Sequence, residues 1–252
     1  MNELELSVVV PTYNEAGNIG PLIERVLAAL EGVRCEILVA DDDSPDRTWE
    51  AAERIAARRP EVRCLRRRSG RGLYPAVMEA FAAAKGRSLA VLDADLQHDE
   101  RILPRMLEAL QKRARALAVG SRHAPGGGVQ DWHWARRWLS FTGNALVGAL
   151  LGRSVRDPMS GFFMIDREVF LQLAPKLKPR GFKILMDVLA HLPPEASIEE
   201  VGYVFKPRRV GESKLDSRVA AAFAAALWDL VLLRLRLAPA ASSLPMPNDR
   251  HR

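Results

Sequence analysis

The chain has 252 residues, of which 48% are hydrophobic and 27% are charged, so it is long enough to bury a sizeable core and is not a disordered or collagen-like sequence. A formal net charge of +6 suits anionic partners, namely nucleic acid, phosphorylated substrates or an acidic membrane surface, without choosing among them. The only two cysteines lie in apolar runs, which argues against a disulfide framework. The N-terminus lacks a basic region before its apolar run, which argues against a signal peptide. No charge-free apolar stretch reaches about 18 residues, which argues against a spanning helix. We therefore expect a soluble or peripheral protein in a reducing compartment, with Cys35 and Cys64 buried in the core.

Short apolar runs alternate with segments of helical periodicity over the first 122 residues. The apolar runs predict strands at residues 6–10, 36–40, 62–65, 88–92 and 116–120. The periodic segments predict helices at residues 19–30, 48–59, 75–85 and 101–112, with Asp46 as a cap of the second. This order predicts an α/β fold with a mostly parallel sheet and helices on both faces.

The pattern changes after residue 122. We expect a flexible glycine-containing loop at 124–129, helices at 132–151, 166–173 and 182–191, and a polar turn that enters a strand at 157–163. A strand at 198–205 precedes a basic loop at 206–214.

The C-terminal part differs in composition from the rest. We predict a globular domain at 1–216, an amphipathic helix at 217–237 and a disordered tail at 238–252, which is rich in Pro, Ser and Asn. The helix carries Asp229, Arg234 and Arg236, so we expect it to lie at a membrane interface or to pack on the domain rather than to span a bilayer.

An acidic cluster follows the fourth predicted strand. If the segment stays extended, Asp93, Asp95 and Gln97 point to one side, and His98 points away from them, which leaves it out of the site. Two carboxylates this close repel each other unless a cation lies between them, and oxygen ligands suit Mg²⁺ or Mn²⁺. Such a metal neutralises charge on a departing phosphate group. The alternative is a solvated acidic turn.

Two further polar loops follow the first and second strands, at residues 11–15 and 41–46. Ligands of parallel sheets bind beyond the carboxyl ends of the strands, and an acidic residue after the second strand can bind a ribose hydroxyl or a base edge. Tyr13 could pack against a base. Alternatively, the Ser-Pro-Asp sequence at 44–46 is only a turn with a helix cap.

Together these loops resemble those of nucleotide-sugar glycosyltransferases of the GT-A fold. The matching segments are Pro-Thr-Tyr-Asn-Glu at 11–15, Asp-Asp-Asp-Ser-Pro-Asp-Arg-Thr at 41–48 and Asp-Ala-Asp at 93–95. Further segments narrow the resemblance to dolichyl- or polyprenyl-phosphate mannosyltransferases: 93–98, Gly-Ser-Arg at 120–122, Asp-Pro-Met-Ser-Gly-Phe-Phe at 157–163 and Gly-Glu-Ser-Lys-Leu at 211–215. The likeness covers residues 6–217.

The resemblance implies a role for each matching residue. Those that would hold the nucleotide sugar are Pro11, Tyr13, Glu15, Ala40 (through its backbone), Asp42, Asp93, Ala94 and Arg208. Those that would hold Mg²⁺ or Mn²⁺ are Asp93, Asp95 and Gln97. Those that would receive the lipid phosphate are Arg122, Arg136, Ser140 and Lys214, with Asp95, Arg122 and Lys214 taken as catalytic.

The sequence departs from the family in two ways. Asp43 stands where the family usually has glycine, although aspartate tolerates a left-handed backbone better than most residues. The spanning helices found at the C-terminus of some relatives are lacking, so membrane attachment would come from elsewhere, for example from an anchoring partner protein.

The implied reaction transfers mannose from GDP-mannose to a polyprenyl phosphate at the inner face of the membrane, with the enzyme cytoplasmic and peripheral. The acceptor is already an oxyanion, so no strong general base is required, and cations offset the repulsion between acceptor and donor. A single displacement would invert the anomeric centre and give a β-mannosyl phosphate lipid and GDP. Asp157 would orient the acceptor or sugar, or else cap a turn.

Two alternatives remain. The donor could be a UDP-sugar, glucose or an aminosugar, with undecaprenyl phosphate as acceptor; a soluble glycan acceptor would require a general base. From a different class, Arg66, Arg67, Arg68, Arg71 and a pI near 9.7 would suit a nucleic-acid or anionic-membrane binding module, although we expect no nucleic-acid partner. Such a module would bind without metal.

Overall fold

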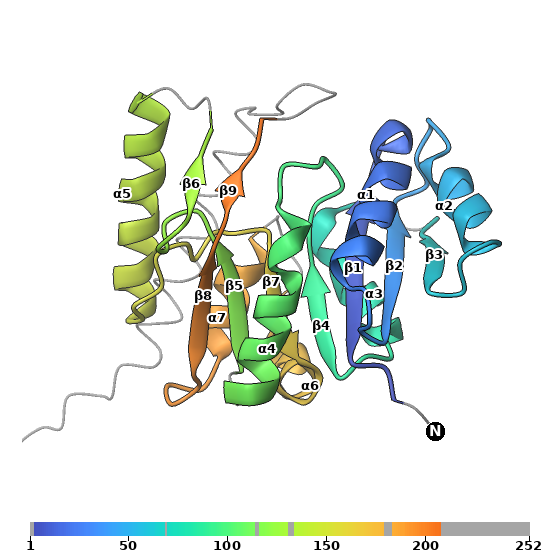
Figure 1. Ribbon diagram of the computed structural model, residues 1–252. Coiled ribbons are helices and arrows are strands. Elements are labelled where there is room, and N and C mark those ends of the chain that lie inside the picture. Colours follow the sequence, from blue (N-terminus) through green and yellow to red (C-terminus); the bar gives the residue numbers. More distant parts are fainter. Residues whose placement is uncertain (1–2, 69, 114–115, 131–133, 179–182, 208–252) are drawn as a thin grey trace, which may run out of the picture.

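The computed structural model describes residues 3–68, 70–113, 116–130, 134–178 and 183–207 (Figure 1). Of the predicted features, Arg208, Lys214, the boundary after residue 216, the helix at 217–237 and the tail at 238–252 lie outside these residues. Within them, no helix combines the length and the hydropathy that crossing a bilayer requires.

A seven-stranded, mostly parallel sheet forms the centre of the molecule, in the order β3-β2-β1-β4-β7-β5-β8 (Figure 1). Its strands are β1 (Leu6–Thr12), β2 (Cys35–Asp41), β3 (Val62–Arg66), β4 (Ser88–Val91), β5 (Leu117–Ser121), β7 (Phe163–Asp166) and β8 (Ile198–Gly202). Only β7 runs antiparallel to its neighbours β4 and β5 among these described strands. The predicted α/β class and mostly parallel sheet are confirmed.

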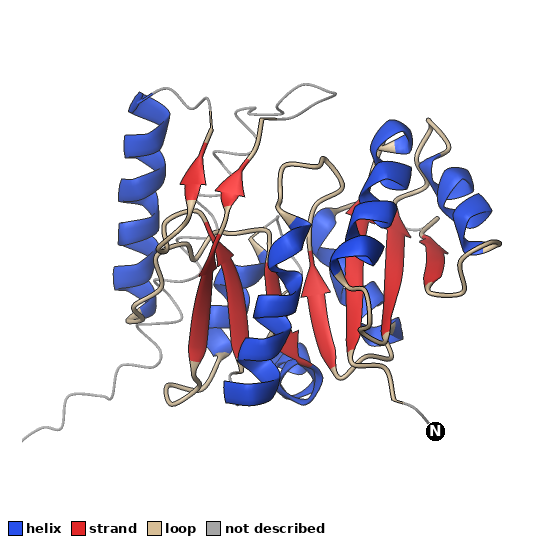
Figure 2. Cartoon of the chain, viewed as in Figure 1, coloured by secondary structure: helices blue, strands red, loops and turns tan. Residues whose placement is uncertain are grey.

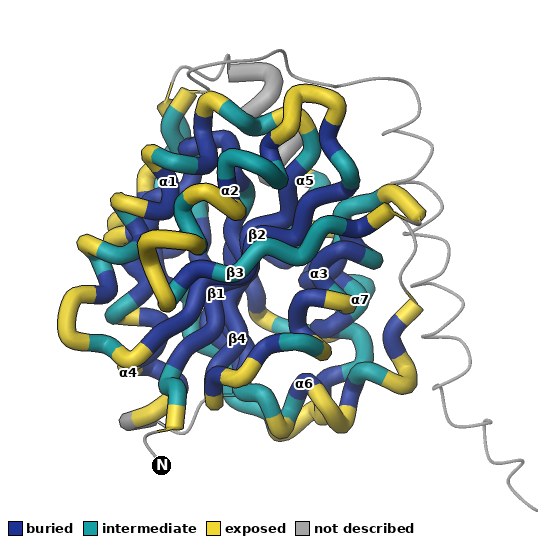
Figure 3. The backbone as a smooth tube through the Cα atoms, turned by 90° about the vertical axis from the view of Figure 1, so that its right-hand side faces the viewer, coloured by how far each residue is buried: buried dark blue, intermediate teal, exposed yellow. Residues whose placement is uncertain are grey.

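Helices cover both faces of the sheet (Figure 2). They are α1 (Ala16–Ala29), α2 (Thr48–Ala56), α3 (Leu73–Ala83), α4 (Leu103–Arg113), α5 (Trp134–Leu151), α6 (Arg167–Leu173) and α7 (Ile184–His191), with single 3₁₀ turns at Glu100–Ile102 and Ala174–Lys176. Successive side chains of a strand point to opposite faces, so Val8 and Val10 pack with α1, α2 and α4, whereas Val9 packs with α3, α6 and α7. The strands β1, β2 and β4 are buried along their whole length (Figure 3).

Two predictions about the second half of the sheet are wrong. The strand expected at 198–205 is divided: β8 ends at Gly202, and β9 (Val204–Phe205) pairs instead with β6 (Gly128–Val129), inside the segment expected to be a flexible loop. The backbone of 124–129 is therefore hydrogen-bonded. The absence of a side chain at Gly127 lets its backbone pack closely against the carbonyl oxygen of Ser121, since a Cβ there would lie only 2.6 Å from that oxygen. The local sequence does not reveal this contact.

The two cysteines differ in burial. Cys35 is buried as predicted, but Cys64 is only partly buried, because it lies on β3 at the edge of the sheet. Burial, followed by the charges of Glu53 and Asp41, raises the pKa of the Cys64 thiol to about 12.

We predict that neither cysteine reacts readily with a disulfide reagent in the folded protein at pH 8, because the thiolate is the reactive form and a pKa near 12 leaves almost none of it for Cys64. Absorbance of the released thiol measures this. Both thiols should react promptly in denaturant, and rapid labelling of the native protein would contradict the assignment.

Candidate active site

The carboxyl ends of three adjacent strands meet at one edge of the sheet. In the parallel ladder, Thr12 of β1 lies beside Asp41 of β2, and Val9 lies beside Val91 of β4. The ladder extends one residue further, since the N–H of Asp42 donates to the carbonyl of Thr12 at 3.1 Å. All three polar loops singled out in the sequence therefore begin at the same edge.

The first two loops are joined by hydrogen bonds from backbone to side chain. The hydroxyl of Ser44 accepts from the N–H of Asn14 at 3.0 Å, and the hydroxyl of Thr48 accepts from the N–H of Glu15 at 2.9 Å. Each bond connects residues at least 30 positions apart, so the two loops form one platform.

Asp46 has the predicted capping contact, although Arg47, in a left-handed conformation, is the residue directly before α2. One oxygen of Asp46 accepts from the N–H and hydroxyl of Thr48, at 3.0 and 2.6 Å. The other accepts from the N–H of Ala16 at 3.0 Å. One carboxylate thus serves the first turns of both α1 and α2.

The platform brings together most residues expected to hold a nucleoside. Pro11 lies beside Ala40 in the β1–β2 ladder, and Asp42 is the first residue after β2. The carboxylate of Asp42 accepts from the N–H of Gly72 at 2.7 Å. Tyr13 lies on the adjoining loop.

Three arginines at and after the end of β3 also belong to this platform, and the sequence analysis assigned them to a possible nucleic-acid patch. Arg66 pairs with Asp43, Arg67 pairs with Asp42, and Arg71 donates to the hydroxyl of Tyr13 at 3.2 Å with its guanidinium 5.1 Å from the ring centroid. The sequence analysis predicted no strand order. Had it placed β3 beside β2 in the parallel sheet, it could have located these arginines, because the segment after β3 must then lie next to the turn after β2.

The acidic cluster after β4 is not an extended segment, so the argument from strand alternation is wrong. The strand ends at Val91, and a turn follows in which Leu96 has φ of +61°. The N–H of Gln97 donates to Asp95 at 3.1 Å, and its side-chain amide donates to the carbonyl of Lys206 at 2.9 Å. Local hydrogen bonds of the turn, rather than the pleat, therefore place these side chains.

The donor atoms of this turn fit a hard divalent cation. In the described part of the chain no three His, Cys, Asp or Glu side chains gather in a metal-binding arrangement. A site here would combine the carboxylates of Asp93 and Asp95 with the amide oxygen of Gln97, which can still accept because the amide nitrogen makes the bond to Lys206. Ala94 between them is buried.

His98 does not point away from the acidic turn, contrary to the prediction. Its ring is buried, and Nδ1 accepts from the N–H of Asp93 at 3.2 Å. The ring packs against Phe162 and Tyr203, with centroids 5.2 and 5.7 Å apart. Burial lowers the pKa of His98 to about 4, so the imidazole is neutral near pH 7. Its Nδ1 is then free of a proton and can accept the hydrogen bond from the backbone of Asp93.

Arg122, expected to bind the acceptor phosphate, forms a buried ion pair with Asp157. The Nε and Nη2 atoms of Arg122 donate to the two carboxylate oxygens at 2.8 and 2.7 Å, and its backbone N–H adds a third bond at 3.0 Å. Although burial alone would raise it, these bonds hold the pKa of Asp157 below its usual value. Asp157 therefore orients the guanidinium of Arg122. The sequence analysis had expected it either to orient the acceptor or sugar or to cap a turn, and had not named this role.

Lys183 is a residue that the sequence analysis missed. It lies just before α7, and its charge interacts with Arg122, Asp157 and Asp93. Burial, followed by the charge of Arg122, lowers the pKa of Lys183 to about 8. No pattern around it singles it out, because α7 reaches the site only through the tertiary fold. Its charge therefore lies within electrostatic range of both the Arg122 pair and the acidic turn.

The remaining predicted acceptor residues are only partly located. Arg136 and Ser140 belong to α5, but the structure does not describe their side chains. Lys214, and Arg208 of the donor set, lie outside the described residues.

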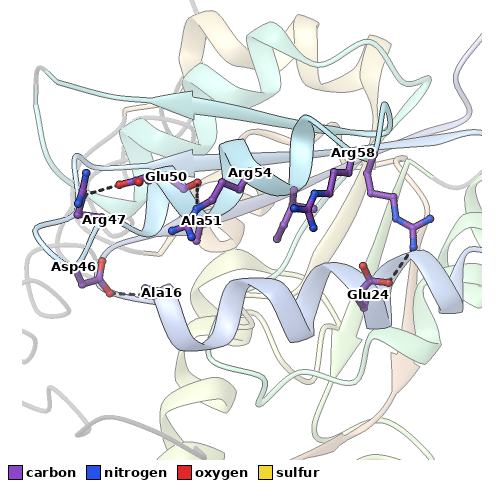
Figure 4. Close-up of a pocket in the computed structure, with 10 residues that line it drawn as sticks. Ala16, Glu24, Asp46, Arg47, Glu50, Ala51, Arg54 and Arg58 are labelled. Carbon is purple, nitrogen blue, oxygen red and sulfur yellow. Dashed lines mark hydrogen bonds and ion pairs between the residues drawn. The ribbon is translucent and has the colours of Figure 1, made fainter.

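A cavity of about 660 Å³ lies elsewhere, between α1 and α2 (Figure 4). Two of the four arginines that line it pair with carboxylates of the same walls: Arg47 with Glu50 at 2.6 Å and Arg59 with Glu24 at 3.3 Å. It contains none of the residues expected to bind metal or acceptor, so we place the active site at the sheet edge.

Comparison with known proteins finds a family and relatives that match most of the chain. Residues 7–173 match Glycosyl transferase family 2. The chain is 41% identical over 218 residues to dolichol-phosphate mannosyltransferase of Pyrococcus furiosus, covering 85% of this chain and 60% of that protein. It is 37% identical over 240 residues to the Saccharomyces cerevisiae protein of the same name, covering 92% and 88%, and 35% identical over 215 residues to polyprenol monophosphomannose synthase of Mycolicibacterium smegmatis, covering 83% and 80%. The chain thus spans less than two thirds of the Pyrococcus relative.

Solved structures share the fold. Glucosyl-3-phosphoglycerate synthase from Mycobacterium tuberculosis, in complex with Mn²⁺, UDP and glucosyl-3-phosphoglycerate, has a TM-score of 0.67 at 21% identity, covering 90% of this chain and 80% of that one. Mannosyl-3-phosphoglycerate synthase from Rubrobacter xylanophilus has a TM-score of 0.65 at 21% identity, covering 92% and 74%.

We predict that Asp157→Asn destabilises the protein by about 3 kcal/mol, because it leaves the guanidinium of Arg122 buried without its counter-charge. Urea unfolding measures the loss. The matched control is Asp99→Asn, whose partner Arg101 is exposed, so little change is expected there. Equal losses in the two variants would show that the Arg122 pair has no special weight.

Proposed function

The chain belongs to glycosyl transferase family 2 and is a glycosyltransferase, and from this premise we propose that it transfers mannose from GDP-mannose to a polyprenyl phosphate, giving polyprenyl phosphate β-mannose and GDP. The observation that carries the proposal is the meeting, at one sheet edge, of a nucleoside platform, an acidic turn and a buried arginine. The names of the relatives support mannose as the sugar and a polyprenyl phosphate as the acceptor.

On the donor side, Tyr13 and Asp42 bind the nucleoside, with Pro11, Glu15 and the backbone of Ala40 completing the platform. Asp93, Asp95 and Gln97 hold a divalent cation, Mg²⁺ or Mn²⁺. When bound, it neutralises charge on the departing diphosphate. The presence of Mn²⁺ with UDP in a structural neighbour supports a divalent metal, not a choice between the two.

On the acceptor side, Arg122 meets the lipid phosphate with its orientation fixed by Asp157. Arg136, Ser140 and Lys214 complete this part of the site, and Arg208 contacts the donor phosphates. An oxygen of the acceptor phosphate attacks the anomeric carbon as the bond from that carbon to GDP breaks, which inverts the configuration. No general base is needed, because the attacking oxygen carries charge already.

The membrane arrangement follows from the acceptor. A polyprenyl chain is buried in lipid, so the enzyme works at the membrane surface, as a peripheral protein on the cytoplasmic face. The helix predicted from the sequence at 217–237, or an anchoring partner protein, would hold it there.

The competing functions fit the site less well. Transfer of a UDP-sugar to undecaprenyl phosphate would use the same acceptor groups and differ only at the nucleoside platform. A nucleic-acid module would need exposed arginines. Of the four that suggested it, Arg68 and Arg71 are exposed, whereas Arg66 and Arg67 pair with Asp43 and Asp42 of the same chain.

We predict that Asp95→Ala lowers transfer by about 100-fold or more while the protein stays folded, because the metal loses a carboxylate ligand. Circular dichroism checks the fold. Asp99→Ala, an acid four residues later in the same segment, should keep most of the activity. Near-normal turnover by Asp95→Ala would refute the metal assignment.

The assay uses labelled GDP-mannose, a short polyprenyl phosphate and Mg²⁺ or Mn²⁺, and counts label that enters the organic phase. We expect labelling that chelation abolishes. Labelling from UDP-glucose alone, run in parallel, would overturn the sugar, and an α-linked product would overturn the inverting displacement.

A further inference from the structure

Two consecutive carboxylates just after β2 face two consecutive arginines at the end of β3. In the parallel β2–β3 ladder Asp41 lies beside Arg66, and the N–H of Arg67 donates to the carbonyl of Asp41 at 2.7 Å. Side-chain ion pairs then continue the pairing past both strand ends, Arg67 with Asp42 and Arg66 with Asp43. We call these four residues the charge ladder.

The inner pair of the charge ladder is buried. The side chain of Arg67 is 2% exposed and that of Asp42 is 8% exposed. Nε of Arg67 also donates to Glu79 at 2.6 Å, and the second oxygen of Asp42 accepts from the N–H of Gly72 at 2.7 Å. Both oxygens of Asp42 are therefore fixed, and each keeps a lone pair for a further donor.

The outer pair is held from two sides. Asp43 has φ of +53°, a left-handed conformation, and its carboxylate accepts from Nε of Arg66 at 2.6 Å and lies 2.5 Å from Nη2. The guanidinium of Arg66 lies 3.6 Å from the ring centroid of Trp49 on α2. The stacking ring restricts the arginine to the position that the carboxylate needs.

The charges explain why the ladder matters. Two adjacent carboxylates repel each other, and both repel an anionic nucleotide. With two guanidiniums the four side chains sum to zero charge, and the segment that carries Gly72 and Arg71 is tied to the platform that carries Tyr13.

We propose that Arg66 and Arg67 are positioning residues for the donor nucleotide: Arg67 fixes the carboxylate of Asp42, and Arg66 neutralises Asp43, so that an anionic nucleotide binds beside two consecutive acids. This inference rests on the proposed function of the site. It extends that function to two residues that no motif of the sequence assigned to it.

The outer pair is tested by isothermal titration of the full chain with GDP and with UDP, each with Mg²⁺. Arg66→Ala leaves Asp43 uncompensated and should weaken binding of the nucleotide by about threefold at low salt, less at high salt. Asp43→Asn keeps a residue that tolerates φ above zero and should bind normally. The double variant should return to normal binding. The matched control is Arg68→Ala, an exposed arginine of the same segment, which should change nothing.

The inner pair is tested with Arg67→Lys, which keeps the charge but cannot contact Asp42 and Glu79 together, and should weaken binding by about tenfold. Glu79→Gln removes the exposed partner alone and should bind normally. Thermal unfolding of each variant shows that it is folded.

A double variant as weak as Arg66→Ala would overturn the inference for Arg66, because the arginine would then act by packing on Trp49. Normal binding by Arg67→Lys would overturn it for Arg67. If the unmodified chain binds neither nucleotide, the proposed function fails and this inference fails with it. If the unmodified chain binds GDP, the proposed function stands, and the binding of the variants decides this inference alone.

Discussion

The site depends on one constraint, the parallel pairing of β1 between β2 and β4. Because the three strands run in the same direction, the loops after them open at a single edge. The buried, apolar strands fix that edge, and the loops can then carry polar residues without loss of the core. The same geometry gathers Asp42, Asp43, Asp93 and Asp95 into a small region, so the fold that builds the site also creates an excess of negative charge there.

Guanidinium groups from other segments offset part of this excess. Arg66 and Arg67 come from the end of β3, and Arg122 comes from the end of β5 to meet Asp157. Each of these arginines is held by a carboxylate and, for Arg66, by an aromatic ring as well. A site for the two anionic substrates proposed above would gain from such pairing, since the cations are oriented before the substrates arrive and little reorganisation is needed.

The part of the site proposed for the acceptor is assembled differently from the part proposed for the donor. Tyr203 lies where β8 leaves the sheet, and its ring packs with His98 and Phe162 beneath the acidic turn and the Arg122 pair. The short β6–β9 pairing redirects the chain at that point. No local pattern predicts this interruption of the last strand. It places the ring of Tyr203 against His98 and Phe162, next to the acidic turn.

The sequence by itself determined the strands of the parallel half, the loops that follow them and the residues at their ends, because hydrophobic periodicity and turn residues act locally. It also indicated the nucleoside platform and the acidic turn through their order along the chain. It did not determine the path of the acidic turn, the place of His98 or the role of Lys183. Only the tertiary structure decided which charges meet: Arg67 and Asp42 are 25 residues apart, and Arg122 and Asp157 are 35 apart. Ion pairs of that separation depend on the alignment of whole strands, and a local pattern carries no record of it.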